Sequence, residues 1–188
     1  MKSLTRARLV QNAVKILDLS PAKSALLLET MINTLKQGVL NGESLRLKNV
    51  GCLSKVYKEA RPGRNPRVPE ELHEISARWV VRFGKPTSTV INQSEWIERV
   101  LTLAQTYIKT CAEEVESFVK LVIKSIFYIP RSGGRLELRG FGTFKAVVRK
   151  AYTGHNPLTL TPVGVKEKTM LKFHASPAFN LLVNGGAR

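Results

Sequence analysis

The chain has 188 residues, 43% of them hydrophobic, which is enough to bury the core of one ordinary domain or two small ones and argues against general disorder. Lys and Arg number 30 against 14 Asp and Glu, a formal charge of +16, and so strong a field indicates a polyanionic partner: nucleic acid first, an anionic membrane or other acidic surface second. Cys52 and Cys111 form no CxxC pair and are expected to be small buried residues, and no apolar run approaches membrane-spanning length.

The first half of the chain predicts two helices, then a strand and a long hairpin. Ser3 is the predicted N-cap of the first helix, and Ser20-Pro21 begins the second with proline at its first position. The apolar faces recur at helical spacing and comprise Leu9, Val10, Ala13, Val14 and Leu17, then Ala25, Leu28, Met31, Ile32 and Leu35. Alternating patterns predict strands over 44–60 and a returning strand over 73–83, with a Gly-Arg-Asn-Pro turn between them.

The second half predicts the same elements in the same order. Its first helix begins at Ser94, and the two helical faces comprise Ile97, Val100, Leu101, Ala104 and Ile108, then Val115, Phe118, Val119, Val122, Ile123 and Ile126. Strand patterns follow over 135–151 and 163–173, and Ser176-Pro177 begins a short closing helix. The first half has no such closing helix, because its segment 84–93 contains Pro, Ser and Thr and predicts a linker.

The two halves are copies of one unit. Pro66 and Pro157 lie 91 positions apart, and at that offset matching residues recur without a gap. Identical pairs include Ser3/Ser94, Arg8/Arg99, Ala13/Ala104, Ile32/Ile123, Leu45/Leu136, Gly51/Gly142, Gly63/Gly154 and Asn65/Asn156. Phe83 matches Phe173 at an offset of 90, so one residue differs within the returning strand. A period this long fits a duplicated small domain rather than a solenoid. The Arg-rich beginning is similar to a mitochondrial presequence, but we interpret it as part of the unit because residues 3–17 correspond to 94–108.

The order of elements, the Gly-Phe-Gly-Thr-Phe run at 140–144 and the Gly-x-Asn-Pro hairpin turns resemble the bacterial HU and IHF family of DNA-bending proteins. The resemblance covers nearly the whole chain twice. It is better in the second half, at Phe141, Gly142, Phe144, Arg149, Gly154, Asn156, Pro157 and Thr159. The second half departs at Tyr152 and His155, where basic residues are usual, and the first departs at Val50, Cys52 and Val68.

The resemblance implies an α+β fold made of two tandem units, 1–83 and 94–188, joined by the linker 84–93. Each unit would have two helices, a three-stranded antiparallel sheet and a long β-ribbon arm, over about 55–80 and about 146–171, and the second unit a short C-terminal helix. The units would pack as an intertwined pseudo-dimer within one chain.

The resemblance also implies that the arms lie in the minor groove of duplex DNA, where Pro66 and Pro157 enter between base pairs and kink the helix. Basic side chains along the arms would neutralise phosphates and so bind DNA with little sequence preference. The residues expected to contact DNA in the first arm are Lys55, Lys58, Arg61, Arg64, Asn65, Arg67, Arg78 and Arg82. Those expected in the second arm are Arg139, Lys145, Arg149, Lys150, His155, Asn156, Lys166, Lys168 and Lys172.

Each of these assignments has a plainer alternative. A single Gly-x-Asn-Pro is usually a surface turn, and an individual cation is often only solvated, but two copies on two basic hairpins favour DNA. Trp79, Trp96, Phe83, Phe173, Phe141 and Phe144 are expected in the core rather than stacked on bases. His155 either contacts DNA or is a tolerated turn residue. Glu70, Glu71 and Glu74 lie in the first arm, whereas the second is nearly free of acids, so we predict that the second arm binds more strongly.

The function predicted from sequence is an architectural, nucleoid-associated protein of the cytoplasm, or one of viral or organellar DNA, that bends or compacts double-stranded DNA. Two alternatives stay open: a sequence-preferring, IHF-like bender, and a structural or assembly protein that reuses the fold. No Gly-rich phosphate loop, metal cluster or nucleophile–base pattern appears in the sequence, so we expect no enzyme, cofactor, metal, small-molecule substrate or membrane partner. The expected state is a monomeric pseudo-dimer that can associate with itself on DNA.

Overall fold

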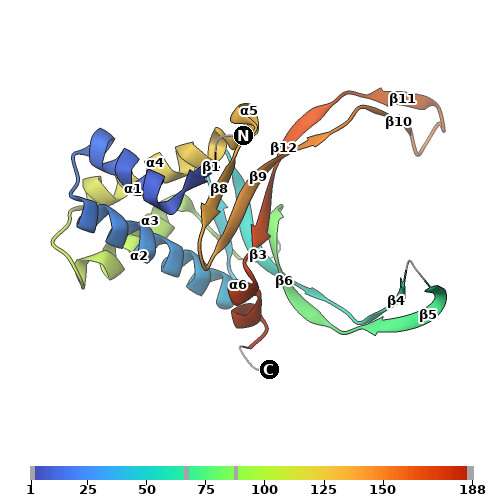
Figure 1. Cartoon of the computed structure of the whole chain (residues 1–188), viewed down its shortest axis with the longest axis horizontal. Helices are drawn as coiled ribbons and strands as arrows, with labels where there is room; N and C mark the ends of the chain where they lie inside the picture. The colour runs from blue at the N-terminus through green and yellow to red at the C-terminus, as the bar shows by residue number, and fades with distance from the viewer. Residues whose placement is uncertain (1–2, 66–67, 87–88, 186–188) are drawn as a thin grey trace.

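The computed structural model describes residues 3–65, 68–86 and 89–185, and it shows a helical body from which two β-ribbon arms extend on one side (Figure 1). The arms curve toward one another, and the helices lie on the opposite side of the sheets. The helices are α1 (Arg6–Leu17), α2 (Pro21–Leu40), α3 (Gln93–Gln105), α4 (Ala112–Phe127), α5 (Ile129–Ser132) and α6 (Pro177–Val183). In the part of the chain that the structure describes, none of them has the length and apolarity that a membrane crossing requires.

The helix starts agree with the sequence at α2 and α6 but not at α1 and α3. The Ser20 hydroxyl accepts the Lys23 N–H at 3.2 Å ahead of Pro21, as predicted. The predicted N-cap Ser3 was wrong: residues 3–5 are extended, and Thr5 caps α1 by accepting the Arg8 N–H at 3.4 Å. Ser94 was also wrong, because α3 begins at Gln93 and includes it. In both cases the chain just before the helix is used as a strand.

Each half forms a sheet of three antiparallel strands, as predicted, and each sheet gains a short parallel strand: β1 of the first half joins the second sheet, and β7, from the segment between the halves, joins the first. The strand order is β6-β3-β2-β7 in one sheet and β1-β8-β9-β12 in the other. The strands are β1 (Ser3–Thr5), β2 (Ser44–Leu47), β3 (Gly51–Lys58), β6 (Arg78–Gly84), β7 (Val90–Ile91), β8 (Arg135–Leu138), β9 (Gly142–Arg149) and β12 (Lys168–Ala175). The pairing of β1 with β8 and of β7 with β2 covers edges that would otherwise leave backbone groups unpaired.

The distal part of each arm is a separate two-stranded ribbon. β4 (Arg61–Asn65) pairs with β5 (Val68–Ile75), and β10 (Tyr152–His155) pairs with β11 (Pro162–Val165). In register, Arg64 faces Leu72 and His155 faces Pro162, so the extra residue of the first arm lies between its tip proline and Leu72. This agrees with the prediction that it lies within the returning strand: Asn65 pairs with Val68 but Arg64 pairs with Leu72, so a bulge in the returning strand β5 accommodates the residue.

One hydrophobic core joins the two halves. The helix α1 packs against α4 as well as α2, and α2 packs against α3, so the helices of the halves alternate in space. Trp96, Phe118, Phe141, Phe144 and Phe179 are among its fully buried side chains, and Phe83 and Phe173 pack partly buried against it. Aromatic side chains of this size supply much of the burial energy of a small core. The predicted intertwined pseudo-dimer is confirmed.

Ion pairs also cross between the halves. Lys23 Nζ lies 2.6 Å from Glu114 Oε2, and these two residues occupy equivalent positions 91 residues apart. Bonds from the Lys23 ammonium, the Thr110 hydroxyl and the Cys111 N–H lower the pKa of Glu114 to about 2. Arg99 binds Glu43 at 2.8 Å, and this hydrogen-bonded carboxylate raises the pKa of the guanidinium.

The C-terminal helix of the second half braces the first arm. The helix α6 packs on β6, and Asn184 at its end exchanges two hydrogen bonds with the backbone of Trp79: it accepts the N–H at 2.8 Å and donates to the carbonyl at 3.0 Å. Trp79 itself was wrongly predicted as core, because it is 38% exposed and rests on Tyr57 with ring centroids 5.2 Å apart.

Cys52 is buried as predicted, but Cys111 is exposed because it stands at the N-cap of α4.

Candidate nucleic-acid interface

Basic residues face each other directly across the strands at the root of each arm. Lys58 on β3 is opposite Arg78 on β6, and Arg149 on β9 is opposite Lys168 on β12, and all four are exposed. Like charges at directly opposed positions repel and destabilise a sheet. Their occurrence at equivalent places in both arms is therefore best explained by an anion that binds between or beside them.

A row of three cations continues this surface over the second sheet. Arg135 on β8, Lys145 on β9 and Lys172 on β12 are opposed in register and exposed on one face. Arg135 was not predicted as a site residue, although the alternation in its strand places it on the same face as Lys145. In the first sheet Arg82 stands opposite the buried Ser54, so the first sheet has no equivalent row among its described residues.

Two of the predicted DNA-binding residues lie away from the exposed arm surfaces. Lys55 turns toward the body, where its Nζ donates to the Leu40 carbonyl at 2.6 Å and lies 5.0 Å from the Trp79 ring. This cation therefore stabilises the C-terminal end of α2, where the helix dipole is negative. Arg139 is exposed, but it lies on the turn between β8 and β9 rather than on an arm.

Where the root of the second arm meets its distal ribbon, a cation is stacked on an aromatic ring. The Arg149 guanidinium lies 4.6 Å from the centroid of the Tyr152 ring and donates to its hydroxyl at 2.6 Å. Stacking fixes the direction in which the guanidinium presents its other N–H groups. Lys150 and Lys166 are exposed where the strands of the arm are interrupted, and His155 is exposed at the end of β10.

The two tips are described to different extents. Pro66 and Arg67 lie outside the described residues, and Asn65 ends β4; Arg61 and Arg64, earlier on that strand, are exposed. In the second tip Pro157 is exposed next to Asn156, whose N–H donates to the Thr161 carbonyl at 3.0 Å. Asn156 therefore closes the loop that presents the proline.

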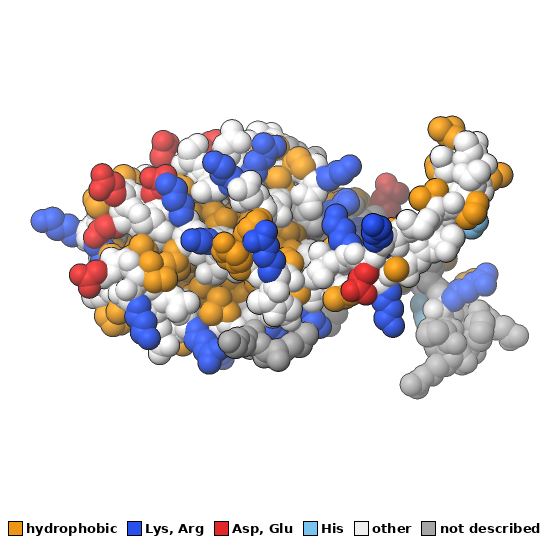
Figure 2. Space-filling model, turned by 90° about the horizontal axis from the view of Figure 1, so that it is seen from above, with side chains coloured by type: hydrophobic (Ala, Val, Ile, Leu, Met, Phe, Trp, Pro, Cys, Tyr) orange, Lys and Arg blue, Asp and Glu red, His pale blue; other side chains and the backbone are white. Residues whose placement is uncertain are grey.

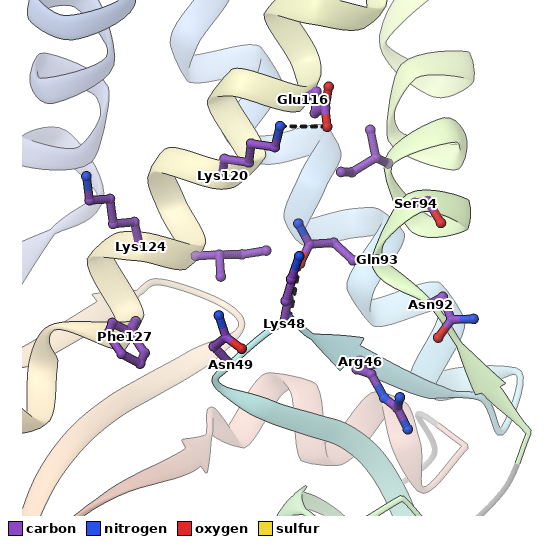
Figure 3. A pocket seen from close by; sticks show the side chains of 12 residues that line it. Arg46, Lys48, Asn49, Asn92, Gln93, Ser94, Glu116, Lys120, Lys124 and Phe127 are labelled. Atoms are coloured by element: carbon purple, nitrogen blue, oxygen red, sulfur yellow. Dashed lines mark hydrogen bonds and ion pairs between the residues drawn. The ribbon is translucent and has the colours of Figure 1, made fainter.

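A basic hollow of about 600 Å³ lies on the body, between the β2–β3 turn and helices α3 and α4 (Figure 3). Arg46 and Lys48 approach it from the turn, and Lys120 and Lys124 from α4. One acidic residue, Glu116, also lines it and pairs with Lys120 at 2.7 Å. These cations were missed because they are far apart in the sequence and only the interleaving of the halves brings them together.

Charge is unevenly distributed over the surface. In the view of Figure 2, Lys and Arg side chains are spread over the body and the root of the arms, whereas most of the visible Asp and Glu lie at the end of the body away from the arms. Such a distribution orients a polyanion toward the arms before contact. The class of protein that this geometry defines is a two-armed, basic clamp for nucleic acid.

The comparisons with known proteins identify the family. The family described as "Bacterial DNA-binding protein" matches twice, over residues 4–93 and 91–184, and the chain therefore belongs to it. It is a DNA-binding architectural protein with two tandem units of this family.

Individual relatives correspond to about half of the chain. Integration host factor subunit beta of Dichelobacter nodosus is 39% identical over 85 residues, 45% of this chain and 85% of that protein. Integration host factor subunit alpha of Ruegeria pomeroyi is 37% identical over 82 residues, 44% of this chain and 81% of that protein. Among solved structures, an Anabaena HU–DNA cocrystal structure covers 50% of this chain and 97% of that chain at 22% identity and a TM-score of 0.41.

Proposed function

We propose that this protein binds duplex DNA with both arms in the minor groove and bends it, with little dependence on sequence. The observation that carries the proposal is the pair of opposed cations at the same position in each arm, Lys58/Arg78 and Arg149/Lys168. A phosphate backbone supplies anions along its length, so each pair can be neutralised without reading a base. Two arms that curve toward one another suit a partner that passes between them (Figure 1).

The contact residues of the proposal are the exposed cations that the structure places on the arms and the second sheet. They are Lys58, Arg61, Arg64, Arg78, Arg82, Arg135, Lys145, Arg149, Lys150, Lys166, Lys168 and Lys172, with Arg139 on the adjacent turn. Lys55 is left out because its ammonium is engaged with the carbonyl end of α2. The contacts of Asn65, Arg67 and His155 with DNA stay predictions from the sequence.

Bending would come from the tips. A proline has a rigid apolar ring and no N–H, so Pro66 and Pro157 can enter a base step without leaving a donor unsatisfied. Unstacking a step costs a few kcal/mol, and the additional phosphate contacts of a bent duplex offset that cost. The exposure of Pro157 supports this role for the second tip.

The differences between the arms favour a second candidate function, binding to a preferred, non-palindromic site. The first arm is one residue longer, and only the second arm has the stacked Arg149–Tyr152 pair among the described residues. Two unequal arms can respond differently to the flexibility of two base steps. Competition between random and selected duplexes at one salt concentration separates the two functions.

We also propose the organisation of the chain and its place in the cell. Residues 1–83 and 94–188 form the two units, with 84–93 between them, since β2 and β3 recur as β8 and β9 at the offset of 91 residues. The protein would act on the nucleoid, or on viral or organellar DNA in another host.

The test is the end-to-end distance of a short duplex labelled with a fluorescence donor and acceptor. We expect the wild type to bring the ends together, and Pro66→Ala and Pro157→Ala each to reduce the bend. Pro62→Ala is the matched control, because Pro62 is an exposed proline near the start of β4, at the end of that ribbon away from the tip. A duplex that stays straight with the wild-type protein would refute bending.

Affinity at several salt concentrations tests the charge arrangement in the same samples. Removal of one phosphate contact is expected to reduce the slope of log affinity against log salt by about 1. Reversal of Lys166 and Lys168 should cost more affinity than reversal of Arg78 and Arg82, since the second arm has fewer acids. Equal losses would contradict the predicted asymmetry.

A further inference from the structure

The tip of the second arm exposes more apolar surface than a proline alone. Leu158, directly after Pro157, is 92% exposed, and Leu160 is 75% exposed. A leucine gains free energy when its side chain leaves water, so two leucines held in solvent at the end of a long arm indicate a surface that is buried in a complex.

Hydrogen bonds within the loop hold these leucines in place. The Asn156 side-chain oxygen accepts the Leu158 N–H at 2.9 Å, and its backbone carbonyl accepts the Leu160 N–H at 2.8 Å. The hydroxyls of Thr159 and Thr161 lie 2.7 Å apart across the same loop. The backbone and polar side chains thus bond within the loop, which leaves the apolar side chains outside.

Leu160 is also held in an unfavourable backbone conformation. Its φ is +55°, and among the described residues the other non-glycine residues with positive φ are Asp18 and Asn49. Asp and Asn tolerate this left-handed conformation, whereas a leucine is disfavoured in it because its Cβ crowds the following carbonyl oxygen. A strained residue that persists at an exposed tip suggests that the shape of the loop serves binding.

The first arm has different residues at these two positions of the sequence. At the offset of 91 residues Leu158 corresponds to Arg67, and Leu160 to Pro69. The first tip therefore has a cation where the second has its most exposed leucine.

We infer that Leu158 enters the duplex together with Pro157, so that the second arm uses a two-residue apolar wedge and the first arm uses proline alone. This inference rests on the proposed DNA-bending function. DNA is the occupant because the arm that ends in this wedge carries Arg149, Lys166 and Lys168 toward its root, which bring a phosphate backbone to it. Leucine, like proline, is among the side chains that can separate stacked bases.

The inference is tested with a duplex that contains 2-aminopurine, whose fluorescence rises when its base step is unstacked, and end labels that report the bend. The variants are Leu158→Ala and Leu158→Gln, and the matched control is Leu72→Ala, an exposed leucine on β5 of the first arm. Because Leu158 is exposed, thermal unfolding of all three variants should match the wild type.

We expect both Leu158 variants to lose much of the 2-aminopurine signal and to bind roughly 10- to 50-fold more weakly, as the loss of two or three buried methyl or methylene groups predicts. The salt dependence should not change, because no charge is altered, and Leu72→Ala should behave as the wild type.

Three results would overturn the inference, and they are distinguishable. A wild-type protein that leaves the duplex straight removes both the bending function and the wedge. A wild-type bend with an unchanged 2-aminopurine signal in Leu158→Ala removes only the wedge. Normal bending combined with lost self-association in sedimentation assigns Leu158 to contacts between copies of the protein instead.

Discussion

The Lys23–Glu114 ion pair favours the pairing of unlike halves, and its removal should cost measurable stability. The two residues occupy equivalent positions of the repeat, and their charged atoms are 2.6 Å apart. If two identical first halves paired in this way, two lysines would meet, and two second halves would bring two glutamates together. The duplication has therefore placed opposite charges where identical units would place like ones.

The size of the effect follows from the pKa of Glu114. A fall from 4.5 to about 2 corresponds to an upper limit of about 3 kcal/mol in the free energy of unfolding. Because the Glu114 side chain is 34% exposed, screening by water reduces the expected contribution to on the order of 1 kcal/mol. Glu114→Gln should lower the free energy of unfolding at neutral pH by about that amount.

The assay is urea unfolding of the wild type, Lys23→Ala, Glu114→Gln and the double variant. The expected coupling energy is about 1 kcal/mol. The control is a second cycle on Lys120 and Glu116, an exposed pair within one helix at 2.7 Å, for which about 0.3–0.5 kcal/mol is expected. Equal coupling in the two cycles, or none at Lys23–Glu114, would refute the argument.

The same pair predicts a dependence on pH. A carboxyl group whose folded pKa is depressed stabilises the protein above its unfolded pKa and loses that contribution as the pH falls through the folded pKa. The stability difference between wild type and Glu114→Gln should therefore be constant above about pH 5 and should shrink between 4.5 and about 2. A difference that persists at pH 2 would show that Glu114 acts by packing rather than by charge.

Two further substitutions test the packing. A Cβ at Gly142 would lie 2.4 Å from the His174 carbonyl oxygen. Gly142→Ala should therefore lower the free energy of unfolding by about 1–3 kcal/mol in urea titrations. The control is Gly164→Ala, which has open space around it and should change the free energy of unfolding by less than about 0.5 kcal/mol. Asn184→Ala removes two hydrogen bonds to Trp79 and should accelerate hydrogen exchange of the Trp79 amide; an unchanged rate would mean that α6 does not brace the first arm.

Much of the architecture could be predicted because the local patterns agree with the fold. The apolar face of α1 was found from spacing alone, with Leu9 and Ala13 fully buried in the structure, and Ser20-Pro21 marked the start of α2. Because the two halves match at one offset, the elements predicted in one half supported those predicted in the other. The cations at the arm roots were each named from the sequence, but their opposition across the strands is known only from the structure.

The errors occurred where contacts between distant segments override local preference. Residues 3–5 precede a helix and are favourable for it, yet they pair with β8, which lies more than a hundred residues away in sequence. Trp79 is hydrophobic but stays partly exposed because its strand leaves the body toward the arm. The hollow at Arg46 and Lys124 joins segments of different halves, and no single window of sequence contains it.

The pairing of β1 with β8 and of β7 with β2 within one chain has a consequence for how the protein behaves at low concentration. Separate subunits dissociate on dilution, and their partnership is set by mass action. Here both sheets, and the strands β1 and β7 that complete them, belong to one chain. Each molecule therefore carries one copy of each arm. Pairing within one chain does not weaken on dilution, so each molecule keeps its two unlike arms together.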